Sequence, residues 1–301
     1  MKKYFPVTVA CFLWIWPPIV IKTLSSYFDN FTQNFYRFLA ASIVLTIFNL
    51  VYHKEEFLKE IKNIKKYILP AIIIFSFQLI WVVGLSTLTP TIGILIGRSS
   101  ILFIAVFSFI FFKDERNIIK SKFFISGALL AVIGVIGVIA SKSRIYLKDF
   151  NIGAAAILSA AILWAVYIMV IKKRVKQTEP LVAAGIILSL SVPLFFIASL
   201  FWGSLSAVTD VSAGINIILF VSGIFCVGVA NAFNFKSIKI IGAALSSTFI
   251  LITPFFTAIA SYFIFKEILN IQQILFGIIL ITGCGLLLRS GNNSSSIEIS
   301  K

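Results

Sequence analysis

The sequence predicts an all-α integral membrane protein in which ten transmembrane helices form two inverted five-helix repeats around a central cavity. Apolar residues make up 59% of the chain and charged residues only 12%, about half the share of roughly 25% found in soluble domains. ACFLWIWPPIVIK (Ala10–Lys22) recurs as AAILWAVYIMVIK (Ala160–Lys172), and FSFIFFKDE (Phe107–Glu115) recurs as IASYFIFKE (Ile259–Glu267). If each copy holds five spans, the odd number inserts the copies upside down relative to each other, a common architecture of secondary transporters.

Ten apolar runs approach the length of about 20 residues that a membrane-spanning helix needs. They are Tyr4–Ile21, Phe31–Tyr52, Tyr67–Thr87, Thr91–Phe112, Phe123–Ala140, Ile152–Ile171, Leu181–Trp202, Ile215–Phe235, Gly242–Phe265 and Ile271–Leu288. We therefore divide the chain into a first repeat (1–145), a second repeat (146–289) and a disordered cytoplasmic tail (290–301). The basic loop Lys142–Lys148 marks the boundary between the repeats.

The basic residues orient the chain. Most of the 26 Lys and Arg residues lie in loops that share one side if the N-terminus is inside, and few lie in the opposite loops. This bias predicts a multi-pass protein of the cytoplasmic (inner) membrane with both termini inside. The net charge of +15 is spread over short loops, so it favours contact with anionic membrane lipid and argues against nucleic acid as a partner.

Catalysis is not expected. The one histidine, His53, sits in a charged loop, and no phosphate-binding GxxxxGK[ST] motif occurs. Cys11, Cys226 and Cys284 lie in apolar runs without the CxxC spacing of a metal or redox site. We therefore expect no enzyme activity, no metal and no cofactor.

Arg98 is the sharpest local signal. It lies about a third of the way along the fourth run, where a charge costs roughly 2.5–3.5 kcal/mol on insertion scales and should face a cavity or a partner. A substrate carboxylate could accept two hydrogen bonds from its guanidinium. The alternatives are hydrogen bonds to backbone carbonyls and extension of the side chain to the outer surface.

Arg37 lies closer to the end of its run, and extension of its side chain to the membrane surface explains it adequately. All eleven acidic residues fall in loops, in the tail or at span ends. Coupling to an ion, if present, would use Glu115 or Glu267, and the alternative for both is interfacial anchoring by a neighbouring lysine.

Other polar and aromatic side chains inside the runs are candidates to line a solute path. They are Trp14, Tyr36, Gln78, Trp81, Trp164, Tyr167, Asn231 and Asn234. Packing is the alternative for the aromatic ones. Pro17 and Pro254 should kink or interrupt their helices. The glycines of the fifth and tenth runs favour close helix packing or contact in a homodimer.

Several motifs resemble those of the EamA family of drug/metabolite transporters. The openings of the two halves, the segment YRFLAAS (Tyr36–Ser42), and the endings FFKDERNIIKSKFFISGALLAVIGVIG and YFIFKEILNIQQILFGIILITGCGLLL carry the resemblance, which covers Tyr4 to about Arg289. Glu115 and Glu267 match the glutamate of the family's helix–glutamate–helix signature, and Pro254 matches the usual proline of the ninth helix. The chain departs from the pattern by a longer spacing from Glu115 to Gly127 and by Arg98, where a small or apolar residue is ordinary.

The resemblance implies ten helices in two inverted halves and a central cavity lined mainly by helices one, three, four, six, eight and nine. It also implies export, sometimes import, of amino acids, related metabolites or xenobiotics by alternating access. We expect a secondary transporter of small amino-acid-like or anionic solutes. The alternatives are a passive facilitator or pore, and a nucleotide-sugar-type metabolite exchanger.

Overall fold

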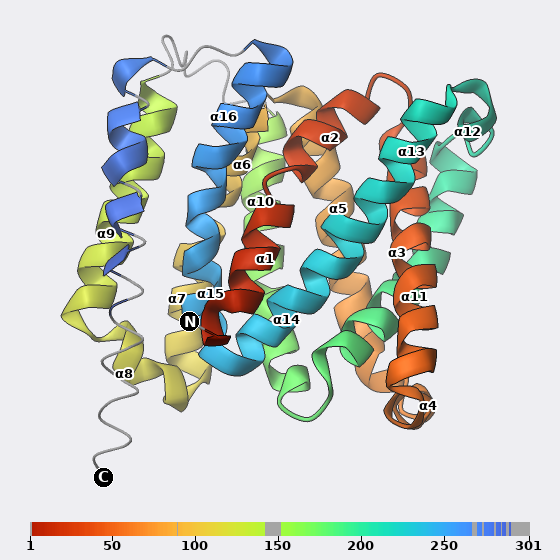
Figure 1. Cartoon of the computed structure of the whole chain (residues 1–301), viewed down its shortest axis with the longest axis horizontal. Helices are drawn as coiled ribbons and strands as arrows, with labels where there is room; N and C mark the ends of the chain where they lie inside the picture. Colours follow the sequence, from red (N-terminus) through yellow and green to blue (C-terminus); the bar gives the residue numbers. More distant parts are fainter. Residues whose placement is uncertain are drawn as a thin grey trace.

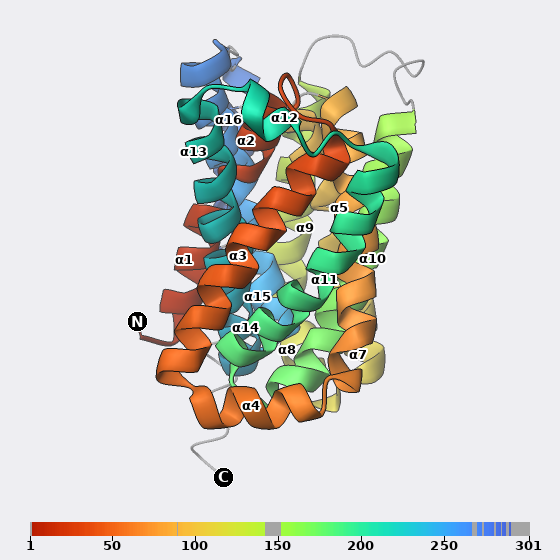
Figure 2. The ribbon, with the colours of Figure 1, turned by 90° about the vertical axis from the view of Figure 1, so that its right-hand side faces the viewer.

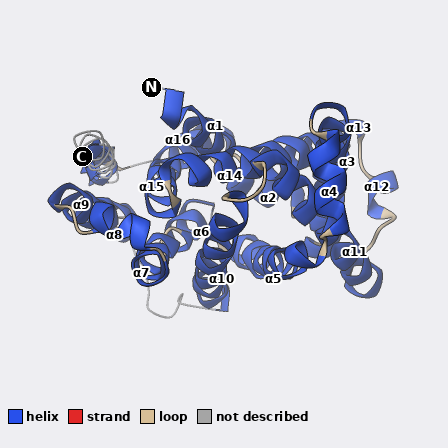
Figure 3. Ribbon diagram, turned by 90° about the horizontal axis from the view of Figure 1, so that it is seen from below, coloured by secondary structure: helices blue, strands red, loops and turns tan. Residues whose placement is uncertain are grey.

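The structure is a computed structural model that describes residues 2–88, 90–141, 152–266 and, between 270 and 289, all but residues 273, 280, 284, 287 and 288. All regular structure in these described segments is helical (Figure 3). Glu267, the loop Lys142–Lys148 that marks the boundary between the repeats, and the tail 290–301 lie outside the described residues. The expectations placed on them stay predictions.

In the first half, the predicted first and fourth spans are each interrupted and form two helices. Its helices are α1 (Phe5–Leu13), α2 (Pro17–Leu24), α3 (Asn30–Tyr52), α4 (Lys54–Lys62), α5 (Lys65–Thr87), α6 (Pro90–Gly97), α7 (Ser100–Phe111), the 3₁₀ turn η2 (Lys113–Glu115), α8 (Arg116–Ile119) and α9 (Lys122–Ala140). The fourth span, expected as one continuous run, is therefore two helices with Arg98 and Ser99 between them.

The second half repeats this order. Its helices are α10 (Ile152–Val175), α11 (Pro180–Trp202), α12 (Ala207–Asp210), α13 (Ala213–Ser222), the π-helix η4 (Gly223–Val229), α14 (Ala230–Ile241), α15 (Ala243–Phe249), the 3₁₀ turn η5 (Ile250–Ile252) and α16 (Thr253–Phe265). A separate, shorter apolar helix follows at Ile274–Gly283.

Seven segments are long and apolar enough to cross a membrane, which agrees with a multi-pass membrane protein. They are Lys2–Leu24, Asn30–Tyr52, Lys65–Thr87, Ile152–Arg174, Pro180–Trp202, Ala213–Ile241 and Ala243–Phe265. The fourth, fifth and tenth predicted spans correspond to shorter apolar helices at Ser100–Phe111, Lys122–Gly134 and Ile274–Gly283. A total of ten crossings therefore remains a prediction.

Helices α3 and α11 show the internal repeat most directly. Both have 23 residues and both follow an acidic N-cap position, Asp29 and Glu179. The Asp29 carboxylate accepts hydrogen bonds from the backbone N–H groups of Phe31 (2.9 Å) and Thr32 (2.8 Å), which fixes where α3 begins. The two helices pack along each other in opposite directions, because α3 ends beside α4 and α11 ends beside α12 at the other end of the bundle (Figures 1 and 2).

The first helix of each half packs against the other half. Helix α10 lies against α5 and α7, while α1 lies against α14 and α15. Viewed along the bundle, α1, α14 and α15 form one long side and α10, α5 and α7 form the other (Figure 3). Each side therefore combines one opening helix with the third and fourth spans of the opposite half, as an inverted repeat with a twofold axis between the sides requires.

Proline explains two of the helix interruptions. Pro17 is the first residue of α2, after α1 has ended at Leu13, and Pro254 is the second residue of α16, after the turn η5. Proline is tolerated in a first helical turn, where its missing N–H would have no partner in any case. The expected interruptions at Pro17 and Pro254 are thus observed.

Glycine allows very close approach at two places. A Cβ built on Gly223, the first residue of η4, would lie 2.4 Å from the backbone oxygen of Arg37 in α3. A Cβ on Gly283 would lie 2.6 Å from the backbone nitrogen of Ala131 in α9. The glycine-rich fifth and tenth runs therefore pack on each other within one chain, and the homodimer stays a prediction.

We expect Gly223→Ala to lower the free energy of unfolding by about 1–3 kcal/mol, because the added methyl group clashes with rigid backbone that must move. Thermal or denaturant unfolding of the purified protein in detergent measures the change. Gly214→Ala is the matched control, since its Cβ would meet only the Ser212 hydroxyl at 3.9 Å. Equal melting temperatures for the two variants would contradict the close contact between η4 and α3.

Candidate functional site

A cavity lies between the two long sides of the bundle and draws its walls from both halves. Its cavity volume is about 80 Å³, below the roughly 300–1,000 Å³ of typical ligand pockets, so in this conformation the walls lie close together. Of the residues singled out from the sequence, its lining includes Trp14, Pro17, Arg37, Gln78, Trp81, Arg98, Trp164 and Asn231. The structure therefore brings together residues from six of the expected spans.

Arg98 occupies the break between α6 and α7. Its Nη2 donates a 2.6 Å hydrogen bond to Oγ1 of Thr253, and that hydroxyl donates onward to the carbonyl of Ile250 at 2.8 Å. The guanidinium of the first half thus reaches the interrupted ninth span of the second half. Its Nε has no hydrogen-bond partner among the described residues, so the guanidinium retains donor capacity at the cavity wall.

Arg37 is not at the membrane surface, so the interpretation that its side chain extends there is wrong. The residue is 1% exposed and lines the cavity. Its Nε and Nη1 have no hydrogen-bond partner in the described part of the chain. The expectation rests on the position of Arg37 near the start of its helix α3. In the structure, η4 packs over this turn of α3, because Gly223 allows the two backbones to approach closely.

A row of aromatic rings forms one wall of the cavity. The rings of Trp14 and Trp164 meet edge to face at 5.5 Å, Trp164 lies 5.0 Å from Phe77, and Phe77 stacks on Trp81 at 5.7 Å. Trp14 and Trp164 occupy the same position in the two sequence repeats. Their direct contact is what an axis passing between the repeats produces.

The interrupted helices are joined to one another by hydrogen bonds. Trp14 Nε1 donates to the carbonyl of Cys226 in η4 (3.1 Å), and Thr257 Oγ1 in α16 donates to the carbonyl of Ile15 between α1 and α2 (2.9 Å). Carbonyl groups released from regular helix geometry need such partners where no water is present. These bonds hold the first, eighth and ninth spans together beside the cavity.

Two amide side chains add polar groups to the lining. Asn231 Nδ2 donates to the carbonyl of Val227 (2.7 Å), and its Oδ1 has no partner among the described residues. The Oε1 of Gln78 is likewise buried without a partner there. Both amides can therefore accept hydrogen bonds from a solute.

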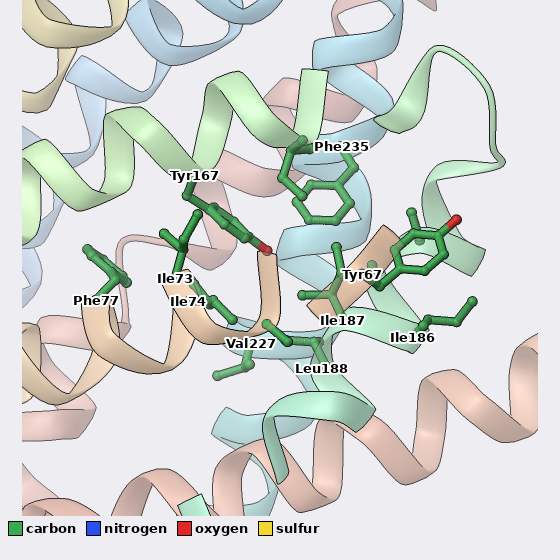
Figure 4. Packing of buried hydrophobic residues seen from close by; sticks show 14 of the residues in the cluster. Tyr67, Ile73, Ile74, Phe77, Tyr167, Ile186, Ile187, Leu188, Val227 and Phe235 are labelled. Atoms are coloured by element: carbon green, nitrogen blue, oxygen red, sulfur yellow. The ribbon is translucent and has the colours of Figure 1, made fainter. Parts of the chain in front are cut away.

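Three other candidates lie away from the cavity lining. Tyr36 donates its hydroxyl to the carbonyl of Leu205 (2.9 Å), and Asn234 accepts a hydrogen bond from Ser246 Oγ (3.3 Å). Tyr167 is fully buried in the main apolar core with Phe235 and Ile74, as Figure 4 shows. These side chains support the walls rather than form the lining.

Three contributing residues were not singled out from the sequence. Phe77 belongs to the aromatic row, and Thr253 holds Arg98. Gln33 is fully buried with both amide atoms unpaired among the described residues, one turn before Arg37. Its spacing of four residues from Arg37 on one helix face was the available signal for Gln33.

Glu115 ties the two halves together at the end of the bundle where α4 and α8 lie (Figure 1). It is 3% exposed and forms an ion pair with Lys172 of α10. Its carboxylate also accepts hydrogen bonds from the backbone N–H groups of Ala243 (2.5 Å) and Ala244 (3.0 Å). A negative charge at the N-terminus of α15 is favourable for the helix dipole as well.

Asp114 extends this cluster to the surface. Its Oδ2 lies 3.2 Å from Nζ of Lys172 and 3.3 Å from Nζ of Lys176. Partial burial by itself would raise the pKa of Asp114, but the hydrogen bond and charge of Lys172, with the charge of Lys176, hold that pKa below its usual value. Asp114 therefore stays ionised over the physiological pH range.

The comparisons with known proteins agree with this architecture. The family model described as the EamA-like transporter family matches residues 1–140 and again residues 151–289. A Haemophilus influenzae protein named as an uncharacterized transporter is 28% identical over 287 residues, which is 91% of this chain and 92% of that protein. The Bacillus subtilis protein named uncharacterized transporter YyaM is 28% identical over 264 residues, 85% of this chain and 84% of that one.

A crystal structure of another protein shares the fold. It aligns with a TM-score of 0.77 and 14% identity over 97% of this chain and 98% of its own. At that identity the likeness concerns the backbone arrangement alone.

We expect Trp14→Phe to lower the free energy of unfolding by about 0.5–1.5 kcal/mol, because the Cys226 carbonyl loses its hydrogen-bond donor while the ring contact with Trp164 is largely kept. Unfolding in detergent measures this loss. Trp16→Phe, at a ring that is 37% exposed two residues further on, is the matched control. A Trp14 variant as stable as the control would show that the bond to η4 contributes nothing.

Proposed function

The chain belongs to the EamA-like transporter family, and from this premise we propose that it is a secondary transporter that exports small organic solutes carrying a carboxylate. The membrane is the cytoplasmic membrane, and both termini lie inside, as the distribution of Lys and Arg favours. Export is the direction usual in the family. The mechanism is alternating access, in which the two halves move around a cavity that opens to one side at a time.

The observation that carries this proposal is the position of Arg98. Its guanidinium is on the cavity wall, it comes from the first half, and its hydrogen bond goes to Thr253 of the second half. A solute carboxylate that displaces Thr253 would give the guanidinium a charged acceptor in place of a neutral hydroxyl, and could accept two parallel hydrogen bonds from it. Solute binding would then change a contact between the moving parts, which is what transport coupled to binding needs.

The aromatic row favours a solute with an apolar part. Trp14, Trp164, Phe77 and Trp81 offer ring faces and edges next to Arg98 and the amide of Gln78. A carboxylate held at one end and an apolar group against the rings suit amino-acid-like compounds and organic acids. The lining has two arginines, fewer cations than a nucleotide diphosphate would need, which disfavours nucleotide sugars.

Glu115 is proposed to close the cavity at the cytoplasmic end. Its carboxylate joins the end of the fourth span to Lys172 and to the start of the ninth span. The end of the fourth span and Lys172 lie on the side of α5, α7 and α10, whereas the start of the ninth span lies on the other side. The hydrogen bonds from Ala243 and Ala244 to Glu115 would therefore have to break for solute to enter from this end. The ion pair with Lys172 holds the Glu115 carboxylate ionised in place, and hydrogen bonds to an ionised acceptor are stronger than neutral ones, so this contact can bias which side is open.

Reconstitution tests the function. Purified protein in liposomes loaded with labelled carboxylates should show saturable exchange that is accelerated by unlabelled solute on the other side. Single-channel currents, or flux that rises linearly with concentration and shows no counter-exchange, would instead identify a passive pore. Equal flux with and without the protein for a broad panel of amino acids and organic acids would refute the transporter.

We expect Arg98→Ala to reduce exchange of carboxylates to the background rate while the amount of protein in the membrane stays normal, because the variant removes the proposed anchor for the solute. Arg116→Ala is the control, since Arg116 donates only to the carbonyls of Phe109 and Ile110 at the exposed end of α7. Flux assays and immunoblots of the same vesicles measure both quantities. Unchanged exchange in the Arg98 variant would remove this residue from the site.

We expect Glu115→Gln to increase the labelling rate of Cys226 from the cytoplasmic side by about tenfold or more, because the uncharged amide weakens the hydrogen bonds from Ala243 and Ala244 that join the two sides and so favours the state open to that side. Impermeant thiol reagents on inside-out vesicles, with Cys11 and Cys284 replaced by serine, measure this rate. Asp114→Asn is the matched control, with the same charge change at a side chain that is 54% exposed. Equal rates in both variants would exclude Glu115 as the closing contact.

A further inference from the structure

Arg37 places a second cation in the cavity that the proposed function does not use. It comes from α3 and lines the same cavity as Arg98, which stands between α6 and α7. No ion pair joins either guanidinium to a carboxylate among the described residues. Arg98 at least has Thr253, whereas Arg37 leaves Nε and Nη1 without a partner there.

Such an arrangement is unfavourable without a counter-charge. An isolated ion removed from water loses several kcal/mol of solvation, and a buried charge without a partner is strongly destabilising. Two guanidiniums around one cavity also repel each other through a medium of low polarity. An anionic group between the walls would relieve both costs, and Arg37 has free donors for it.

The surroundings of Arg37 also favour an anion. Gln33, one turn earlier on the same face of α3, is fully buried, and its amide group has an unpaired N–H donor in the described structure. On the other side, η4 packs so closely that Gly223 touches the backbone of Arg37. The backbone of α3 at Arg37 is therefore held against η4, which fixes the position from which the side chain reaches the cavity.

We propose that Arg37 forms a second anion subsite that is filled together with the one at Arg98, so that the preferred solute carries two carboxylates. This inference rests on the proposed function for the first anchor and narrows the solute class to dicarboxylates with an apolar body. The aromatic row would contact the carbon chain, and the separation of the two guanidiniums would select its length.

Tryptophan fluorescence tests the proposal without any need for transport, because Trp14, Trp81 and Trp164 line the cavity. The purified full-length protein in detergent is titrated with dicarboxylates of three to eight carbons and with the monocarboxylate of equal length. At least one dicarboxylate should bind about tenfold to a hundredfold more tightly than its monocarboxylate partner, as expected for one added charge-assisted hydrogen-bonded group. Equal affinities across the series would overturn the second subsite.

Variants locate the effect. Arg37→Gln should reduce the affinity for the preferred dicarboxylate about tenfold more than the affinity for its monocarboxylate, and Arg37→Lys should restore part of the preference. Arg116→Gln, at the surface, should leave the ratio as it is. A ratio that survives Arg37→Gln would overturn the assignment.

A third variant covers the case in which Arg37→Gln does not fold. Cys226→Asp adds a carboxylate on η4, at a position that lines the same cavity as Arg37. This internal anion should occupy Arg37 and abolish the dicarboxylate preference while Arg37 is retained. An unchanged preference in Cys226→Asp would contradict the proposal.

The outcomes separate this inference from the proposed function. Monocarboxylate binding that requires chloride in the wild type and not in Arg37→Gln would overturn the dicarboxylate and assign the subsite to an inorganic anion. Dicarboxylate binding that depends on Arg37 without any exchange in vesicles would support the subsite and refute the transporter. Carboxylate exchange without a preference for two charges would do the reverse.

Discussion

The hydrogen bonds that satisfy interrupted helix backbone at the centre of the bundle are the constraint on which the rest of the structure depends. In lipid, a carbonyl released from helical geometry has no water to accept from, so a break is tolerated only where it is buried in protein or lines a water-filled cavity. Trp14 and Thr257 supply donors to the carbonyls of Cys226 and Ile15. Both donors come from a span other than the one that contains the carbonyl, so the breaks and the packing of the halves require each other.

The charges follow from the same constraint. The break between α6 and α7 places Arg98 next to Thr253, which follows the turn η5 in the ninth span. In the sequence repeat, Arg98 corresponds to Ile250, the first residue of that turn. The two halves are thus irregular at matching positions but chemically different there, with a guanidinium on one side and a hydroxyl and proline on the other. Of these two breaks, only the one in the first half therefore presents a cation to the cavity.

The sequence predicts the helical class, the repeat and part of the cavity lining, because these depend on patterns that each element carries by itself. Apolar runs locate the helices, and proline locates the breaks at Pro17 and Pro254. The break at Arg98 has no such local signal, since it is set by the contact with Thr253 in the other half. The burial of Arg37 likewise depends on Gly223, which is far away in the chain. Tyr167 and Asn234 differ from Trp164 and Asn231 by one turn or less of helix, and only the packing decides which of them reaches the cavity.

The exchange of opening helices between the halves has a consequence for how the protein is made. Helix α10 is synthesised after α5 and α7, against which it packs. Helix α1 is synthesised long before α14, against which it packs. When only the first repeat has been inserted into the bilayer, Arg37 and Arg98 therefore lack the cavity walls that the second repeat supplies. Biogenesis cannot proceed by finishing one half and then the other: the early segments must be shielded, by lipid headgroups or by the insertion machinery, until Trp164 arrives to meet Trp14.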